Sequence, residues 1–190
     1  MTGGSARDAI SQDVLVSTIG ADGAPAAWVR TGKLPIALWY HGCGLTGGRL
    51  YVWGGLTTRA RNAVNEKVFS APFTGSTVGE WREEPQTMRS PVYNAGFCSG
   101  SNCLVCVAGK YANEYANEYP TNVIWFTTVR EGAVQPWTLL KTDLTAWANL
   151  AVAVDKPTGR CFVTGGTARN TPKGASPLVD QVAAFQIPTK

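Results

Sequence analysis

The stretch RLYVWGG, residues 49–55, joins an apolar and aromatic segment to two consecutive glycines. The same order of residue types returns in CLVCVAG at 103–109 and in RCFVTGG at 160–166. Short apolar runs bounded by glycine are typical of β-strands, and glycine tolerates the positive φ that a sharp exit from a sheet requires. We therefore expect three equivalent strands, each of which leaves its sheet at a glycine.

Two independent markers show that these strands belong to an internal repeat. The last glycines of the three phrases, at intervals of 54 and 57 residues, are Gly55, Gly109 and Gly166. The tryptophans that follow turn glycines, at intervals of 53 and 56 residues, are Trp28, Trp81 and Trp137. Because both markers share one period, and both intervals lengthen together, the sequence predicts repeated structural units.

Each unit contains four short apolar segments. The first segment runs into the glycine phrase, the second is the phrase itself, the third follows a long loop, and the fourth carries the tryptophan. The third segments are NEKVFSAPF (65–73), TNVIWFTTV (121–129) and DQVAAFQI (180–187), and an N-terminal version is DVLVSTI (13–19). Four short strands separated by Gly, Pro and Asn predict one antiparallel sheet per unit. A lone sheet cannot bury both faces, whereas a stack or a ring of sheets can.

The composition agrees with a folded, turn-rich β protein. The chain has 190 residues, of which 44% are hydrophobic and 16% charged, and it contains 21 glycines and 11 prolines. The net charge of +4 is spread along the chain without a block of Lys and Arg, so we expect no nucleic-acid partner. No stretch approaches 18 apolar residues, so we expect no membrane span. The N-terminal MTGGSARDAISQD does not resemble a signal peptide, and the localisation is left undetermined.

The glycine-ended second strand, the tryptophan after a glycine turn and the length of the period resemble the kelch repeats of β-propellers. The resemblance covers roughly residues 13–187. It implies an all-β fold, a propeller-like array of four-stranded antiparallel blades. The middle repeat departs from the pattern, because Ala108-Gly109 replaces the double glycine and CLVC replaces the usual aromatic residue. The alternative is a β-sandwich whose strands are periodic by accident.

The strand count predicts an incomplete ring within a single domain or propeller fragment, residues 1–190. Blade strands are expected in 13–30, 36–84, 92–139 and 147–187, a little over three blades. Propellers usually have four to eight blades. Three explanations are open: the chain is a piece of a longer protein, a second chain completes the ring, or a compact four-bladed form closes when the terminal strands share a sheet.

The cysteines and the single histidine provide little support for a metal or a cofactor, and we expect neither. Cys98, Cys103 and Cys106 have a spacing similar to that of iron–sulfur ligands. The strand register places Cys103 and Cys106 on opposite faces, which favours buried free thiols, although a Cys98–Cys103 disulfide remains an alternative. His41, the only histidine, begins a first strand, and the kelch resemblance implies a position lining the central channel.

No enzyme signature accompanies these residues. One histidine cannot build the two-histidine copper site of the galactose-oxidase relatives, and the S-x-D-x-G-x-T-W box of sialidases is missing. A solvated turn is the simplest explanation for the carboxylates of GEWREEP, namely Glu80, Glu83 and Glu84. We therefore expect a protein that is not an enzyme.

The loops after the glycine phrases carry the functional prediction. They are long for hairpins, and the kelch resemblance implies that they share one face of the propeller. The candidate binding residues on that face are Arg59, Arg61, Tyr111, Tyr115, Tyr119 and Arg169. Tyr and Arg are enriched at binding hot spots, so the sequence favours a binding module for a protein or a glycan. The alternative is a structural or assembly module that self-associates or pairs with another chain, as a surface or virion fibre component.

Overall fold

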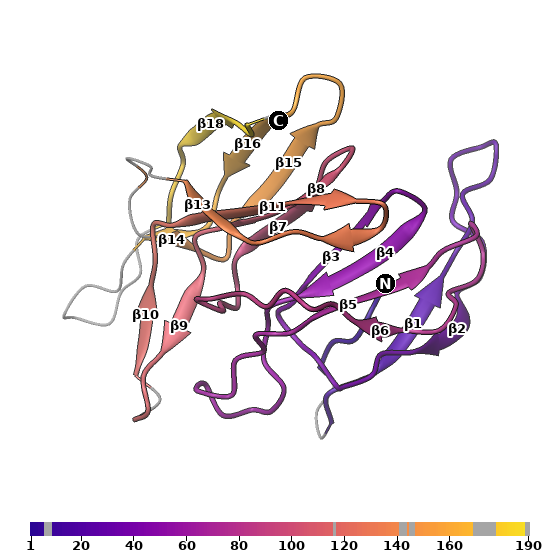
Figure 1. The fold of residues 1–190 in the computed structure, drawn as a ribbon, viewed down its shortest axis with the longest axis horizontal. Helices are drawn as coiled ribbons and strands as arrows, with labels where there is room; N and C mark the ends of the chain where they lie inside the picture. The colour runs from indigo at the N-terminus through magenta and orange to yellow at the C-terminus, as the bar shows by residue number, and fades with distance from the viewer. Residues whose placement is uncertain (6–8, 116, 141–143, 145–146, 169–177, 189–190) are drawn as a thin grey trace.

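The structure, a computed structural model, describes residues 1–5, 9–115, 117–140, 144, 147–168 and 178–188 (Figure 1). Within these residues the secondary structure is entirely strands, and no helix occurs. Every strand pair is antiparallel. The prediction of an all-β chain built from antiparallel sheets is confirmed.

Four successive sheets make up the body of the molecule. The N-terminal sheet contains β1 (Asp13–Val16) and β2 (Val29–Lys33). The second sheet has the order β3 (Gly42–Thr46), β4 (Arg49–Trp53), β5 (Val68–Pro72) and β6 (Arg82–Glu83). The third contains β7 (Gly96–Ser99), β8 (Cys103–Val107), β11 (Ile124–Arg130), β12 (Ala133–Val134) and β13 (Thr138–Leu140). The C-terminal sheet contains β15 (Ala151–Asp155), β16 (Arg160–Thr164) and β18 (Val182–Gln186).

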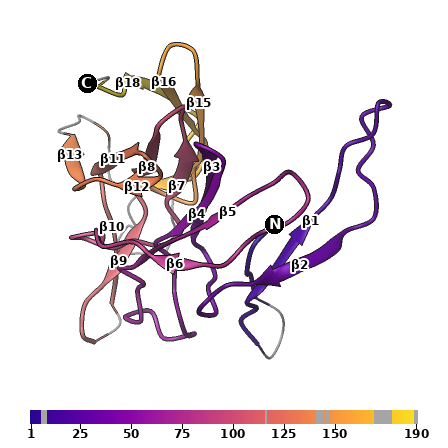
Figure 2. The same ribbon diagram turned by 45° about the vertical axis from the view of Figure 1, so that its right-hand side comes forward.

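Two short pairs of strands complete the fold. The hairpin of β9 (Lys110–Ala112) and β10 (Glu118–Pro120) projects from the third sheet, and β14 (Trp147–Ala148) pairs with β17 (Thr167–Ala168). The N-terminal and C-terminal sheets lie at opposite ends of the array (Figures 1 and 2). Among the described strands, β1 and β2 pair only with each other and β18 pairs with β16. The compact form in which the terminal strands share a sheet is therefore wrong.

Each sheet has a forward face, toward the next sheet along the chain, and a backward face, toward the preceding one. Strand β8 shows how the alternation of side chains serves both faces. Leu104 and Cys106 point backward into the core shared with the second sheet. Cys103, Val105 and Val107 point forward into the core shared with the C-terminal sheet. All five side chains are buried, so β8 is apolar throughout because both of its faces are covered.

The repeated tryptophans occupy equivalent places in successive sheets. Trp28, Trp81 and Trp137 each stand immediately before the last strand of their sheet, which is β2, β6 or β13. Trp81 and Trp137 pack into the cores behind their sheets. Trp28 differs, because no described sheet lies behind the N-terminal sheet, and it is 56% exposed.

The end of every second strand in the three later sheets has the same left-handed backbone. The φ angles are 66° and 83° at Gly54 and Gly55, 54° and 95° at Ala108 and Gly109, and 66° and 96° at Gly165 and Gly166. The middle repeat therefore keeps the backbone although alanine replaces the first glycine. Left-handed backbone costs a residue with a Cβ roughly 1–2 kcal/mol, which explains why glycine holds the other five positions.

These exits also join each sheet to the next. The N–H of Gly55 donates to the carbonyl of Val92, 2.9 Å away, and the N–H of Gly109 donates to the carbonyl of Trp147, 2.8 Å away. Both acceptors belong to the chain that enters the following sheet. The carbonyl of Gly55 in turn accepts from the N–H of Asn65 at 2.8 Å, where the long loop returns. The exit thus fixes both the neighbouring sheet and the ends of the loop.

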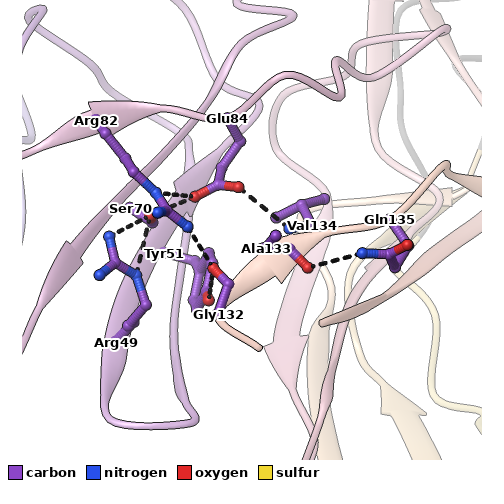
Figure 3. Close-up of polar contacts among 9 residues, drawn as sticks. All are labelled: Arg49, Tyr51, Ser70, Arg82, Glu84, Gly132, Ala133, Val134 and Gln135. Carbon is purple, nitrogen blue, oxygen red and sulfur yellow. Dashed lines mark hydrogen bonds and ion pairs between the residues drawn. The ribbon is translucent and has the colours of Figure 1, made fainter. Parts of the chain in front are cut away.

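A buried carboxylate makes a second joint between the second and third sheets (Figure 3). Glu84 is 2% exposed and accepts hydrogen bonds from the Ser70 hydroxyl at 2.5 Å, from Arg82 Nε at 2.9 Å and from the N–H of Val134 at 3.1 Å. The solvated turn expected for this residue is therefore wrong. The last bond spans the interface, because Val134 belongs to β12 of the third sheet.

The neighbouring carbonyl of Gly132 reinforces that joint. It accepts from the hydroxyl of Tyr51 at 2.9 Å and from Arg82 at 2.7 Å (Figure 3). Burial raises the pKa of Glu84, but hydrogen bonds from Ser70, Val134 and Arg82, together with the charge of Arg82, outweigh burial and hold the pKa below its usual range. Glu84 is therefore an ionised structural group.

Replacement of Gly55 by valine tests the strand exit. A Cβ at Gly55 would lie 2.6 Å from the carbonyl oxygen of Trp39 and 2.8 Å from the Cα of His41. Gly75 is a matched control, because its φ of 84° is the same but a Cβ there meets nothing within 4 Å. We expect Gly55→Val to lower the free energy of unfolding by at least about 2 kcal/mol more than Gly75→Val, measured in urea. Equal losses would show that the close approach to Trp39 and His41 is unimportant.

Replacement of Glu84 by glutamine tests the buried joint. The variant loses charge-assisted bonds in a buried site, so we expect a loss of about 1–3 kcal/mol at pH 7. Since the folded pKa is depressed, the stability that the carboxylate contributes is complete above the unfolded pKa of about 4.3 and disappears as the pH falls through the folded value. Glu84→Gln should reduce the dependence of the free energy of unfolding on pH in that acidic range. Glu83→Gln, which removes only an exposed ion pair with Lys67, should change stability by less than about 1 kcal/mol. Equal effects of the two variants would contradict the joint.

Candidate functional site

The loop that leaves β4, residues 54–67, lies beside the β9–β10 hairpin (Figure 1). The amide of Asn62 donates to the carbonyl of Glu114, 3.3 Å away, and Arg61 Nε lies 3.6 Å from a carboxylate oxygen of Glu118. Both segments begin at a glycine exit, so equivalent strand ends bring them to one rim although they are distant in sequence.

The three tyrosines of the stretch YANEYANEY, residues 111–119, lie on the β9–β10 hairpin. Tyr111 and Tyr119 are directly paired across the two strands, and their rings stack with centroids 5.3 Å apart and an interplanar angle of 27°. Asn113 closes the turn, because its side-chain oxygen accepts from the N–H of Tyr115 at 3.1 Å and of Asn117 at 3.0 Å. Tyr115 is left at the tip, 76% exposed. The three tyrosines therefore form a stacked pair and a separate tip.

Glu118 holds the base of the hairpin in place. Its carboxylate accepts a hydrogen bond from the hydroxyl of Tyr93 and forms ion pairs with Arg61 and Lys110, each at 3.6 Å. Burial raises the pKa of Tyr93, and the hydrogen bond and charge of Glu118 raise it further, so Tyr93 remains a neutral donor. The positive charge of Arg61 is therefore paired with the carboxylate of Glu118 within the protein.

Arg61 also covers an aromatic pair at the start of the second sheet. Its guanidinium carbon lies 5.5 Å from the centre of the Trp39 ring, a cation–π distance. Trp39 stacks on Tyr40 with ring centroids 4.3 Å apart, and its indole N–H donates to the carbonyl of Thr58 at 2.9 Å. Arg61 therefore links the loop, the hairpin and the entry to β3.

A cleft of about 710 Å³ opens between this loop and the hairpin. Its walls include Asn62, Pro91, Tyr111, Thr121 and Trp125. The indole N–H of Trp125 and the hydroxyl of Thr121 are buried and have no hydrogen-bond partner among the described residues. The cleft therefore combines flat aromatic surface with an exposed amide, and the two unpaired polar groups lie buried in its walls.

The structure brings three of the six predicted residues together. Arg61, Tyr111 and Tyr119 meet around the hairpin, but Tyr111 alone of these lines the cleft. Arg59 lies exposed on the loop after β4, and Tyr115 is at the hairpin tip, outside the cleft lining. The sixth residue, Arg169, lies outside the described residues.

Several site residues were missed at the sequence level. Trp39, Tyr93 and Trp147 recur at intervals of 54 residues, and each pairs with the segment that follows a glycine exit. That regular spacing could have been used to predict the structural role of Trp39 from the sequence. Glu118 and Trp125 had no such signal, because their roles depend on partners from other segments.

The cysteines are all free thiols. Cys103 and Cys106 lie in different cores, on opposite faces of β8, as the register predicted. The thiol nearest to Cys98 belongs to Cys161 of the C-terminal sheet, with the two sulfur atoms 3.8 Å apart. Burial raises the pKa of Cys106 and of Cys103, so both thiols are held neutral.

His41 is packed against the N-terminal segment. Its Nε2 atom shares a hydrogen bond with the hydroxyl of Thr2 at 2.9 Å, and its Nδ1 atom is buried without a partner among the described residues. Burial lowers the pKa of His41 to about 4, although the contact with Thr2 offsets part of the shift. The imidazole is therefore a neutral packing group at pH 7.

Comparison with known proteins identifies the fold. No protein-family model and no curated protein matches the chain, whereas 125 chains of solved structures do. One of these, titled "Structure of YjhT", has a TM-score of 0.64 and 15% identity, with 84% of this chain aligned. YjhT has a β-propeller-type fold. The chain therefore forms a β-propeller-type array, and it spans only 46% of the length of that neighbour. Within the described residues, no helix has the length and apolar character needed to cross a membrane.

The protonation of His41 can be measured directly, because it is the only histidine. A histidine with a folded pKa near 4 and an unfolded pKa near 6.5 takes up its proton only on unfolding between these values. We expect its NMR imidazole signals to stay unchanged from pH 8 to 5.5, and the stability to decline as the pH falls below 6.5. His41→Asn should remove that decline between pH 7 and 5, where carboxylates contribute little. Titration near pH 6.5 in the folded protein would contradict the buried position.

Proposed function

We propose that this chain is a non-enzymatic binding module, built on kelch-type sheets, that recognises a protein or a glycan at the rim cleft between residues 54–67 and the β9–β10 hairpin. The observation that carries the proposal is the cleft itself. Its volume of about 710 Å³ lies within the range of about 300–1,000 Å³ that is usual for ligand sites.

The chemistry of the walls favours an uncharged contact surface. Among the described residues that line the cleft, none is Asp, Glu, His, Lys or Arg. Tyr111 and Trp125 offer flat surfaces on which a sugar ring or an apolar side chain can stack. Asn62 supplies both a donor and an acceptor. This composition resembles that of binding sites more than that of sites for acid–base chemistry, which need titratable groups.

The surrounding contacts support a prearranged site. The stack of Tyr111 on Tyr119 restricts the ring that faces the cleft, and the ion pairs of Glu118 hold the hairpin against residues 54–67. Rigid aromatic side chains contribute contact area at a low cost in conformational entropy. In this arrangement Arg61 positions the wall, and the aromatic and amide groups meet the ligand.

The ligand is found with a glycan array and a pull-down, and the site is then tested by calorimetry. Tyr111→Ala should weaken binding by roughly 1 kcal/mol or more, about fivefold, because it removes the stacking surface. Tyr115→Ala separates the cleft from the hairpin tip, and binding in the cleft predicts a smaller effect for it. Leu45→Ala is the matched control, because Leu45 is also exposed but lies near the end of β3, toward the opposite rim. Weakening by Leu45→Ala with Tyr111→Ala silent would place the site on the opposite rim and overturn the proposal.

A further inference from the structure

The forward face of the C-terminal sheet has an exposed apolar centre beside a polar row of Asp155, Arg160 and Gln186, and the guanidinium carbon of Arg160 lies 5.5 Å from the centre of the Phe162 ring. Along one row of paired residues, Phe162 of β16 lies between Ala153 of β15 and Ala184 of β18. All three are exposed, and so is Val182 in the next row; Phe162 is 39% and Val182 70% exposed. The backward face of the same sheet is packed into the core with the third sheet. One side of this sheet is therefore covered and the other is open.

The equivalent apolar positions of the third sheet are buried. Val105 and Phe162 each stand four residues before the last glycine of their phrase, and Ile124 corresponds to Val182 in the strand pairing. Val105 is 0% and Ile124 1% exposed, because both lie against the C-terminal sheet. The open face thus has the apolar character and the position of a surface that the fold elsewhere covers with another sheet.

Small residues in the first strands show how the sheets interlock. A Cβ at Gly42 would lie 2.5 Å from Phe97, and one at Gly96 would lie 2.1 Å from Val152, so the first strand of each following sheet inserts there. Ala151 is the counterpart of Gly96, two residues after a positive-φ asparagine. The C-terminal sheet keeps a small residue at the point where a following sheet would approach.

The other end of the array exposes the complementary face. Trp28, which stands immediately before β2, is 56% exposed. Trp28 corresponds to Trp137, which is only 8% exposed because it packs against the second sheet. The N-terminal sheet therefore presents an uncovered backward face with the large side chain that fills the other junctions.

We propose that the forward face of the C-terminal sheet docks against the backward face of the N-terminal sheet of a second copy of this chain, so that two copies close one ring through two identical junctions. Inside the chain, forward faces always meet backward faces, and the two open ends are one of each kind. Because no forward face packs against another forward face within the chain, we expect the junction between two copies to be head to tail. The length agrees, because this chain covers 46% of the YjhT chain, and two copies supply about its full length. This assembly is independent of ligand binding at the rim cleft.

The mass in solution is the first test. Sedimentation equilibrium of the 190-residue chain should give twice the 20.2 kDa of one copy. A monomer at micromolar concentration would overturn the proposal and would point to a cover from elsewhere, such as a further sheet of a longer chain. Open polymers would overturn the closed two-copy ring.

Two substitutions then test the faces. Phe162→Glu and Trp28→Glu each place a charge in both junctions of the ring, so each variant alone should fall to the mass of one copy. Both residues are exposed within one copy, so circular dichroism and thermal melting should show that each variant stays folded. Tyr115→Glu is the matched control, an exposed aromatic residue on neither face, and it should retain the doubled mass.

Mixing the two variants identifies the arrangement. In a head-to-tail ring, a mixed pair has one junction with both substitutions and one junction with none, so the mixture should recover part of the doubled mass. If two forward faces met instead, Trp28→Glu would keep the doubled mass and mixing would restore nothing. That outcome would overturn the head-to-tail junction while confirming that the C-terminal face is an interface.

Discussion

The left-handed pair of residues at the end of each second strand is the constraint on which the rest of the structure depends. It turns the chain out of the sheet. It also lets the N–H of Gly55 donate to the carbonyl of Val92 and the N–H of Gly109 donate to the carbonyl of Trp147, so one local conformation also positions the next sheet. The space around Gly55 is closed by the Trp39 carbonyl and by His41. A side chain there would therefore disturb the strand exit, the entry to the same sheet and the junction beyond it together.

Between these exits, the junctions of the sheets use two kinds of contact. Apolar side chains on facing strands fill most of each interface, with a tryptophan behind the last strand and small residues in the first. The junction between the second and third sheets adds the buried Glu84, bonded across the interface to Val134. A paired buried carboxylate contributes little net energy compared with an apolar substitute, but its bonds are directional. Glu84 therefore fixes how the two sheets are aligned more than it strengthens their contact.

Much of the fold could be predicted from the sequence, because strand alternation and glycine exits are local signals. The expected segments at 65–73 and 180–187 contain β5 and β18, and the segment at 121–129 covers all but the last residue of β11. Burial could not be predicted in the same way. Trp28 matches the other tryptophans in sequence and is exposed because its neighbour is missing among the described residues, and Glu84 is charged and buried because its partners come from two sheets. The rim cleft was also missed, since segments far apart in the sequence, from Asn62 to Leu139, form its walls.

The glycine exits repeat from sheet to sheet, whereas the loops that follow them differ. Because the residues on either side of a long loop are tied to one another, as the bond from Asn65 to Gly55 ties residues 54–67, the loop between them can change without disturbing the sheet. In the second sheet that loop carries Arg61, and in the third the equivalent segment is a hairpin with a stacked pair of tyrosines. The cleft exists only because two such different loops leave neighbouring sheets at equivalent points. A repeated backbone thus produces a cleft that is not repeated, and the chemistry of its walls comes from the residues that break the repeat.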